Sequence, residues 1–188
     1  MPEAILFTAI KVLGPVAKLL SPFVSPIRKY FEQPKVAVRL VFQHSGRRTH
    51  GMTQNNKFPP NGEAISIGDL ANYNHLYELR WNFELILTNN SEITAYRLRF
   101  PEHEGIKVTI EPAFDYTFPL APNARRVYTL TATIPYESTP AEADKVVKEG
   151  PASVLRIEYE NIKGRRYYTD FYAKEKDETK KNEYGVVE

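Results

Sequence analysis

Apolar and polar residues alternate along much of residues 35–173, which is the pattern of β-strands that bury one face. The clearest run is 77–87, where Trp81 stands at the centre of an apolar face and polar side chains occupy most of the other face. Residues 35–43 show the same alternation and end at a turn signal, His44-Ser45-Gly46. We therefore expect 77–87 to be the central core strand and 35–43 to be a shorter strand.

Further alternation predicts strands over 96–100, 106–110 and 127–134. Residues 155–159 and 167–172 form a last pair, separated by a turn that contains Asn and Gly, so they predict a β-hairpin. About seven short strands with turn signals between them are typical of two antiparallel sheets packed face to face. The fold class that we predict is therefore all-β, an antiparallel two-sheet sandwich.

One short helix is expected between the late strands. Thr139 is a candidate N-cap, Pro140 suits the first helical position, and Glu142 places a carboxylate in the first turn. Gly150-Pro151 supplies a stop signal. These residues predict a helix over 140–149.

Three segments that contain turns resemble immunoglobulin-like and fibronectin-III-like sandwich domains of bacterial proteins: 87–91, 119–123 and 159–169. The resemblance covers residues 35–173 and implies an Ig-like sandwich. A disulfide of the antibody type is excluded, because the chain has no cysteine. Sandwiches of this kind host adhesion, scaffolding and ligand-binding roles, so the resemblance implies a fold and no particular activity.

The first 34 residues differ from the rest, because they form a largely apolar segment with helical periodicity. Lys11 and Lys18 fall on one narrow polar stripe, and several prolines break the segment into short or kinked helices. A basic and aromatic cluster, 28–31, follows. We expect residues 1–34 to form a kinked amphipathic helical segment in front of a β-domain, 35–173.

Three interpretations of this segment stay open: a helix in a membrane interface, a helix packed on the sandwich or on copies of itself, and a true membrane span. The lysines and prolines inside the segment disfavour a span. In the interfacial interpretation, which we favour, apolar side chains enter the membrane and basic side chains reach lipid phosphates. Both membrane interpretations predict a cytoplasmic β-domain on the cytoplasmic face of a membrane. The predicted contacts, for a membrane or for a second copy, are Ile5, Leu6, Ile10, Lys11, Leu13, Lys18, Leu19, Leu20, Phe23, Arg28 and Lys29.

Composition limits the other options. The 188 residues, 42% of them hydrophobic, suffice for one buried core and are too few for two ordinary domains. The formal net charge of +2 is smaller than dedicated nucleic-acid-binding proteins usually carry, so we do not expect nucleic acid as a partner. The absence of cysteine excludes thiolate chemistry and fits a reducing compartment. No phosphate-loop or dinucleotide fingerprint appears, and we predict no cofactor.

Two segments lie outside the strand pattern. Residues 47–75 are rich in Asn, Pro and Gly, and a loop of this length is typical of a functional surface, so we predict a protein-binding loop there. Residues 174–188 are almost entirely charged or polar, and we expect them to form a disordered tail.

Basic and aromatic side chains gather near the predicted hairpin and at the start of the 47–75 loop. Guanidinium and aromatic groups together favour stacking and charge recognition, which makes them candidates for ligand binding. The alternative is an ordinary solvated sheet face, in which Glu158 and Glu160 pair with the arginines across the hairpin. The candidates are Arg47, Arg48, Arg165, Arg166, Tyr167 and Tyr168.

Catalytic and metal-binding patterns are weak. His44, His50, His75 and His103 lack the paired spacing of a metal site, so we predict no metal. Residues 102–104, Glu-His-Glu, offer an acid–base cluster for hydrolysis, but the flanking Pro and Gly predict a solvated turn.

The patterns together favour a non-enzymatic β-sandwich interaction module that is tethered to a membrane surface through its N-terminal helix. The alternative is a soluble homo-oligomeric structural protein that assembles through the same helix. A hydrolase with its site in the loops is the least favoured of the three.

Deleting residues 1–33 tests the membrane interpretation. In a liposome flotation assay the full chain should float with the lipid and the shortened chain should stay soluble, because the deletion removes the side chains that enter the bilayer. Equal flotation of the two chains contradicts the interpretation. Light scattering without lipid tests the alternative, since oligomers that dissociate on truncation support self-assembly.

Overall fold

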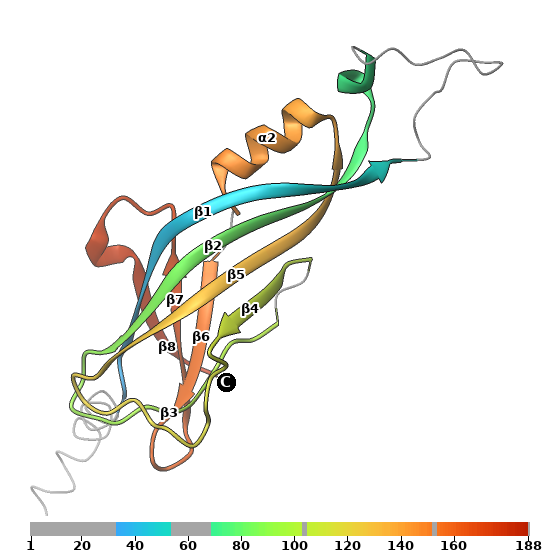
Figure 1. The fold of residues 1–188 in the computed structure, drawn as a ribbon. Coiled ribbons are helices and arrows are strands. Elements are labelled where there is room, and N and C mark those ends of the chain that lie inside the picture. The colour runs from blue at the N-terminus through green and yellow to red at the C-terminus, as the bar shows by residue number, and fades with distance from the viewer. Residues whose placement is uncertain (1–32, 54–68, 103–104, 152–153, 188) are drawn as a thin grey trace, which may run out of the picture.

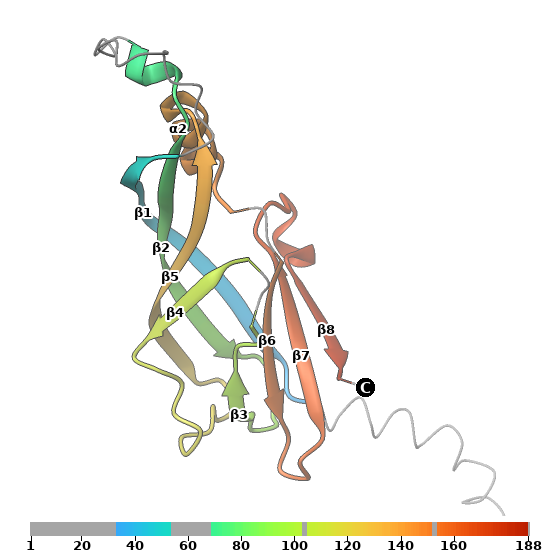
Figure 2. The same ribbon diagram turned by 90° about the vertical axis from the view of Figure 1, so that its right-hand side faces the viewer.

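The computed structural model describes residues 33–53, 69–102, 105–151 and 154–187, and these contain two antiparallel sheets of four strands each. Figures 1 and 2 show the sheets as two layers, with one helix beyond the end of the smaller layer. The prediction of a mostly β, two-sheet antiparallel fold is confirmed. The predicted helical segment, 1–34, lies almost wholly outside the described residues.

The first sheet is built from long strands. Its order is β1 (Val36–Met52), β2 (His75–Asn89), β5 (Arg125–Ser138) and the short β4 (Lys107–Glu111). The expected alternation over 77–87 is confirmed, since Tyr77, Leu79, Trp81, Leu85 and Leu87 are all buried.

The second sheet is shorter. Its order is β3 (Tyr96–Arg99), β6 (Val154–Glu160), β7 (Arg166–Tyr172) and β8 (Asn182–Val186). The predicted hairpin is confirmed by the β6–β7 pairing, in which Val154 lies opposite Tyr172 and Glu160 opposite Arg166. Two short 3-10 helices, η2 (Asp69–Asn72) and η3 (Glu178–Lys180), lie in the connections.

The main core lies where the two sheets overlap. Each inner strand contributes apolar side chains at every second position, and burying one Leu or Ile contributes about 1.5–3 kcal/mol. The core residues from the first sheet include Val36, Val38, Leu85, Leu87 and Leu130, and those from the second include Leu155, Ile157, Tyr159, Tyr167 and Phe171.

The first sheet extends beyond the second, and helix α2 (Pro140–Glu149) covers the extension (Figures 1 and 2). Its bounds match the predicted helix, and Thr139 and Glu142 form a capping box that satisfies backbone donors at its start. Ala143 packs in a second core cluster with Tyr77, Leu79 and Trp81. The helix therefore covers the apolar part of the first sheet that the smaller sheet does not reach.

The predicted end of the first strand at His44-Ser45-Gly46 is wrong. β1 continues through this signal to Met52 and stays paired with β2, so residues 47–52 are strand rather than loop. Register shifts between Phe42 and His44, and between Thr49 and Gly51, change which face the side chains occupy. The change of phase hides the strand from a search for strict alternation. In the rest of the predicted protein-binding loop, residues 54–68 lie outside the described residues, and residues 69–75 contain η2 and the start of β2.

The prediction of a disordered tail over 174–188 is also corrected. Asp177 caps η3 through the backbone N–H of Thr179, and β8 then pairs with β7 from Tyr167 to Phe171. The polar composition does not prevent pairing, because β8 needs only one apolar contact face and its backbone is satisfied by β7. Gly185 lies opposite Tyr168 in this pair.

Substitution of Gly185 by Ala tests the docking of β8. An added Cβ would overlap the outer end of the Tyr168 ring, and that ring is covered by the Arg156 guanidinium at 4.0 Å. We expect Gly185→Ala to lower the free energy of unfolding by about 1–3 kcal/mol in chemical denaturation, as overpacking does. The matched control is Gly46→Ala, where nothing lies within 4 Å of the added Cβ, and we expect a change within about 0.5 kcal/mol. Equal stability of the two variants would contradict this packing.

Candidate functional site

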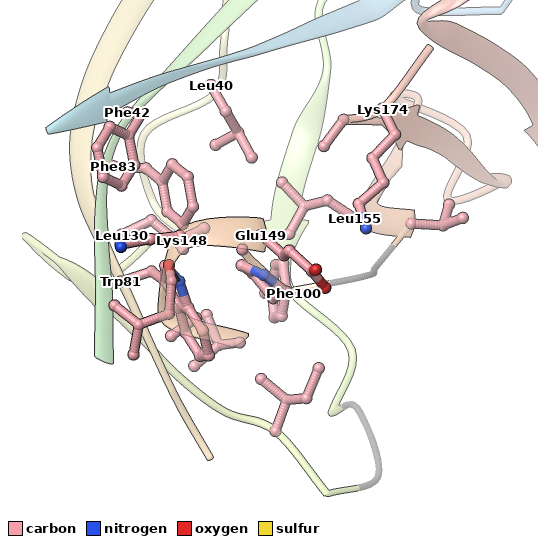
Figure 3. Close-up of a pocket in the computed structure, with 18 residues that line it drawn as sticks. Leu40, Phe42, Trp81, Phe83, Phe100, Leu130, Lys148, Glu149, Leu155 and Lys174 are labelled. Carbon is pink, nitrogen blue, oxygen red and sulfur yellow. Dashed lines mark hydrogen bonds between the residues drawn. The ribbon is translucent and has the colours of Figure 1, made fainter. Parts of the chain in front are cut away.

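An apolar cleft lies at the junction of the two sheets and the last turn of α2 (Figure 3). It has a volume of about 280 Å³ and is partly open to solvent. Because α2 and the second sheet cover different parts of the long first sheet, the strip between them stays uncovered. We refer to this hollow as the cleft.

Neighbouring strands of the first sheet form the floor of the cleft. Phe83 lies opposite Leu130 and Trp81 opposite Ala132 in the β2–β5 pairing, and Val108 of β4 flanks Ala132 on its other side. The small side chain of Ala132 stands between these two larger neighbours and leaves space above the sheet. The depth of the cleft therefore depends on one alanine.

The walls come from several elements. Leu40 and Phe42 stand on β1, Leu155 is the second residue of β6, and Val147 belongs to α2. The rings of Phe42 and Phe83 meet edge to face with centroids 5.9 Å apart. Phe42 is 57% exposed although it is aromatic, so the cleft opens to solvent along β1.

Trp81 fixes the position of the helix wall. Its indole Nε1 donates a hydrogen bond of 2.9 Å to the carbonyl oxygen of Val147. Val147 lies in the last turn of α2, where carbonyl groups have no intrahelical donor. The bond therefore satisfies the only tryptophan of the chain and holds the helix end against the sheet.

Among the described lining residues, the charged ones are solvent-exposed and stand at the rim. Lys148 and Glu149 follow Val147 on α2, and Lys174 follows the end of β7 (Figure 3). The cleft interior is lined by aliphatic and aromatic groups, which favour an apolar occupant over a polar one. Each methylene that moves there from water contributes about 0.8 kcal/mol.

The candidate ligand residues of the hairpin do not share one surface. Tyr167 is 1% exposed and stacks on Tyr159 in the core, with ring centroids 6.3 Å apart, whereas Tyr168 lies on the opposite face under Arg156. Arg165 lies near the Tyr167 ring at 5.8 Å. The arrangement separates the two tyrosines because neighbouring strand residues face opposite sides.

Ion pairs occupy the outer face of the second sheet. Glu158 accepts from Arg99 at 2.8 Å and from Arg166 at 3.0 Å, and Arg97 contacts Glu160 at 2.9 Å. Arg156 binds Asp170 through two parallel hydrogen bonds of 2.7 and 2.6 Å. This bidentate bond raises the pKa of the Arg156 guanidinium. Glu158 and Asp170 are buried, at 9% and 7% exposure, and their pairs use the guanidinium groups of Arg99, Arg166 and Arg156 within the protein.

Arg47 and Arg48 point away from each other. Arg47 contacts Asp144 of α2 at 2.8 Å and lies 4.8 Å above the Tyr77 ring, so it joins β1 to the helix. Arg48 is exposed on the neighbouring position of β1. Arg47 therefore has a structural contact that the sequence pattern did not indicate.

Several other predicted residues lie outside the described chain or apart from one another. The membrane contacts Ile5 to Lys29 and the Glu-His-Glu cluster beyond Glu102 are not described. His44 contacts the Asn82 amide at 3.0 Å. In the described parts of the chain, no three His, Asp or Glu side chains gather as a metal site requires. No described helix has the length and apolar composition needed to cross a bilayer.

Comparisons with known proteins give no relatives. No family model matches the chain, and no curated protein or solved structure shows significant similarity to it. The cleft is thus interpreted from its own geometry.

Sequence reasoning did not find the cleft. Its lining comes from β1, β2, β4, β5, β6 and α2, and most of these residues read correctly as core positions. One signal was present in the sequence: Ala132 is the one small residue at an inward position of 127–134, where Tyr128, Leu130 and Ile134 are large. A small residue on a core face marks a place where packing can be incomplete.

Proposed function

We propose that this chain is a β-sandwich binding module that takes an apolar group of a partner into the cleft. The single observation that carries the proposal is the apolar hollow between sheets of unequal length, open along β1. The size of the cleft is close to the lower end of ordinary ligand pockets, about 300 Å³. It suits one aliphatic or aromatic group.

The walls support binding without large rearrangement. The bond from Trp81 to Val147 fixes the α2 wall, and the floor belongs to the paired strands β2, β5 and β4. A site whose walls are fixed in advance loses little conformational entropy on binding. Solvent-exposed Phe42 at the mouth gives an incoming group its first apolar contact.

A second part of the proposal concerns location. We infer from the sequence pattern that residues 1–34 attach the module to the cytoplasmic face of a membrane, with self-assembly through the same segment as the alternative. β1 begins at the end of the sandwich opposite α2 (Figure 1), so attachment before Val36 leaves the helix end of the sandwich directed away from the membrane. The immunoglobulin-like assignment of the sandwich is likewise a proposal, which rests on the resemblance of the turn segments.

Filling the cleft tests the binding function. We expect Ala132→Phe to weaken binding of decanol, a neutral aliphatic chain, at least about tenfold, because the new ring occupies the space above the floor. Binding is measured through the emission of Trp81, the only tryptophan, which lines the cleft. Val127→Phe is the matched control, since Val127 stands on the same strand with an exposed side chain on the opposite face.

Thermal denaturation of both variants shows whether they remain folded. An unaltered decanol affinity in folded Ala132→Phe, or no response of Trp81 to decanol in the unaltered protein, would overturn the proposed function.

A further inference from the structure

We propose that the partner binds as an extended peptide strand, with an apolar–acidic–apolar sequence, along the free edge of β1 beside the cleft. The inference rests on the proposed function and names the chemistry of the partner. It follows from the direction of the β1 backbone groups, the hollow beside them and the charges next to that hollow.

β1 is an edge strand of the first sheet, and its backbone groups at alternate residues point away from β2. Hydrogen bonds at two residues show which positions of β1 direct their backbone groups away from β2. The carbonyl oxygen of Val36 accepts from Thr169 Oγ1 at 2.7 Å, and the N–H of Val38 donates to Asn182 Oδ1 at 2.7 Å. Since the direction repeats every second residue, Leu40 and Phe42 direct their backbone groups to the same edge.

Asn182 shows that this edge of β1 can form hydrogen bonds like those of a neighbouring strand. Its side-chain amide also donates from Nδ2 to the carbonyl oxygen of Val38 at 3.1 Å, so the amide takes the place of one residue of a neighbouring strand. These strand-like hydrogen bonds from Asn182 reach no farther along β1 than Val38. In the described parts of the chain, no strand pairs with β1 on this side at Leu40 or Phe42.

The neighbouring space suits an added strand. A shallow hollow of about 800 Å³ follows β1 from Ala37 to Phe42 and is bordered by Phe171 and Asn182. Leu40 and Phe42 line both this hollow and the cleft. In an antiparallel pair, the residue opposite Leu40 places its side chain on the same face, which is the face of the cleft. A peptide residue two positions away does the same at Phe42.

The residue between these two apolar side chains lies opposite Val41 and faces the other side, where two arginines outnumber one carboxylate, Glu84, which pairs with Val41 from β2. Arg39 and Arg125 both line the hollow, and neither has an ion pair among the described residues. Lys181 and Glu178, at the same border, are paired with each other. A carboxylate on the peptide residue between the two apolar positions would therefore lie beside Arg39. The attraction between the two charges favours an acidic residue at that peptide position.

A labelled seven-residue peptide tests the inference with the full chain. The peptide has leucine at positions three and five and glutamate at positions two, four and six, and its affinity is measured by fluorescence anisotropy. A second peptide is N-methylated at both leucine amides, which removes the strand hydrogen bonds and leaves the side chains. We expect N-methylation to weaken binding at least about tenfold.

Variants of β1 give an independent measurement. Leu40→Pro removes an edge N–H that β2 does not use, and Leu40→Ala is its matched control, because it removes the same side chain and retains the N–H. We expect Leu40→Pro to bind the peptide at least about fivefold more weakly than Leu40→Ala. Arg39→Glu should weaken the glutamate peptide at least about threefold and strengthen a lysine peptide with the same leucines.

The outcomes separate the inference from the proposed function. If the N-methylated and unmodified peptides bind equally, or if decanol binds in the cleft and the peptide does not, strand pairing is overturned and the apolar cleft stands. If neither decanol nor the peptide binds, both proposals fail. The N-methylated peptide is tested on the unaltered protein, so a folding defect in Leu40→Pro does not affect the decision.

Discussion

The unequal length of the two sheets is the constraint on which the rest of the structure depends. β1, β2 and β5 have 17, 15 and 14 residues, whereas the strands of the second sheet have four to seven. A long apolar face left in water is unstable, so the chain covers the excess with α2. In this structure α2 and the end of the second sheet leave a gap between them, and the cleft is that gap. The helix that covers the first sheet and the cleft beside it thus have one origin.

At the opposite end the sheets are joined by polar side chains that are buried or half-buried. Tyr159, Thr169 and Asn182 all bond the first residues of β1, and Tyr159 and Thr169 also bond each other at 3.0 Å. Burial raises the pKa of Tyr159 to about 12, because the charged phenolate would lose its hydration in the core. These bonds satisfy the edge of β1 where the sheets are close. Farther along, the sheets diverge and the edge is open, which places the free backbone groups beside the cleft.

Much of the fold was predictable because its elements follow local rules. Strict alternation located β2 and the β6–β7 hairpin, and Thr139 with Gly150 marked both ends of α2. The extension of β1 was hidden because bulges shift the phase of alternation. β8 was missed because its composition is polar and its place depends on β7, which is a tertiary effect. The cleft was beyond local rules altogether, since it arises from the unfilled space among six elements rather than from any one pattern.

The position of Asn182 late in the chain affects how the domain is made. Asn182 and the other residues that bind the start of β1 follow all four strands of the first sheet in the chain, so they are synthesised after that sheet. Before these residues are made, the first sheet already has its long strands, but the outer edge of β1 has no hydrogen-bond partners. Until β6 and β7 are made, β1 is therefore exposed along its whole outer side, and unpaired strand edges of this kind are prone to aggregate.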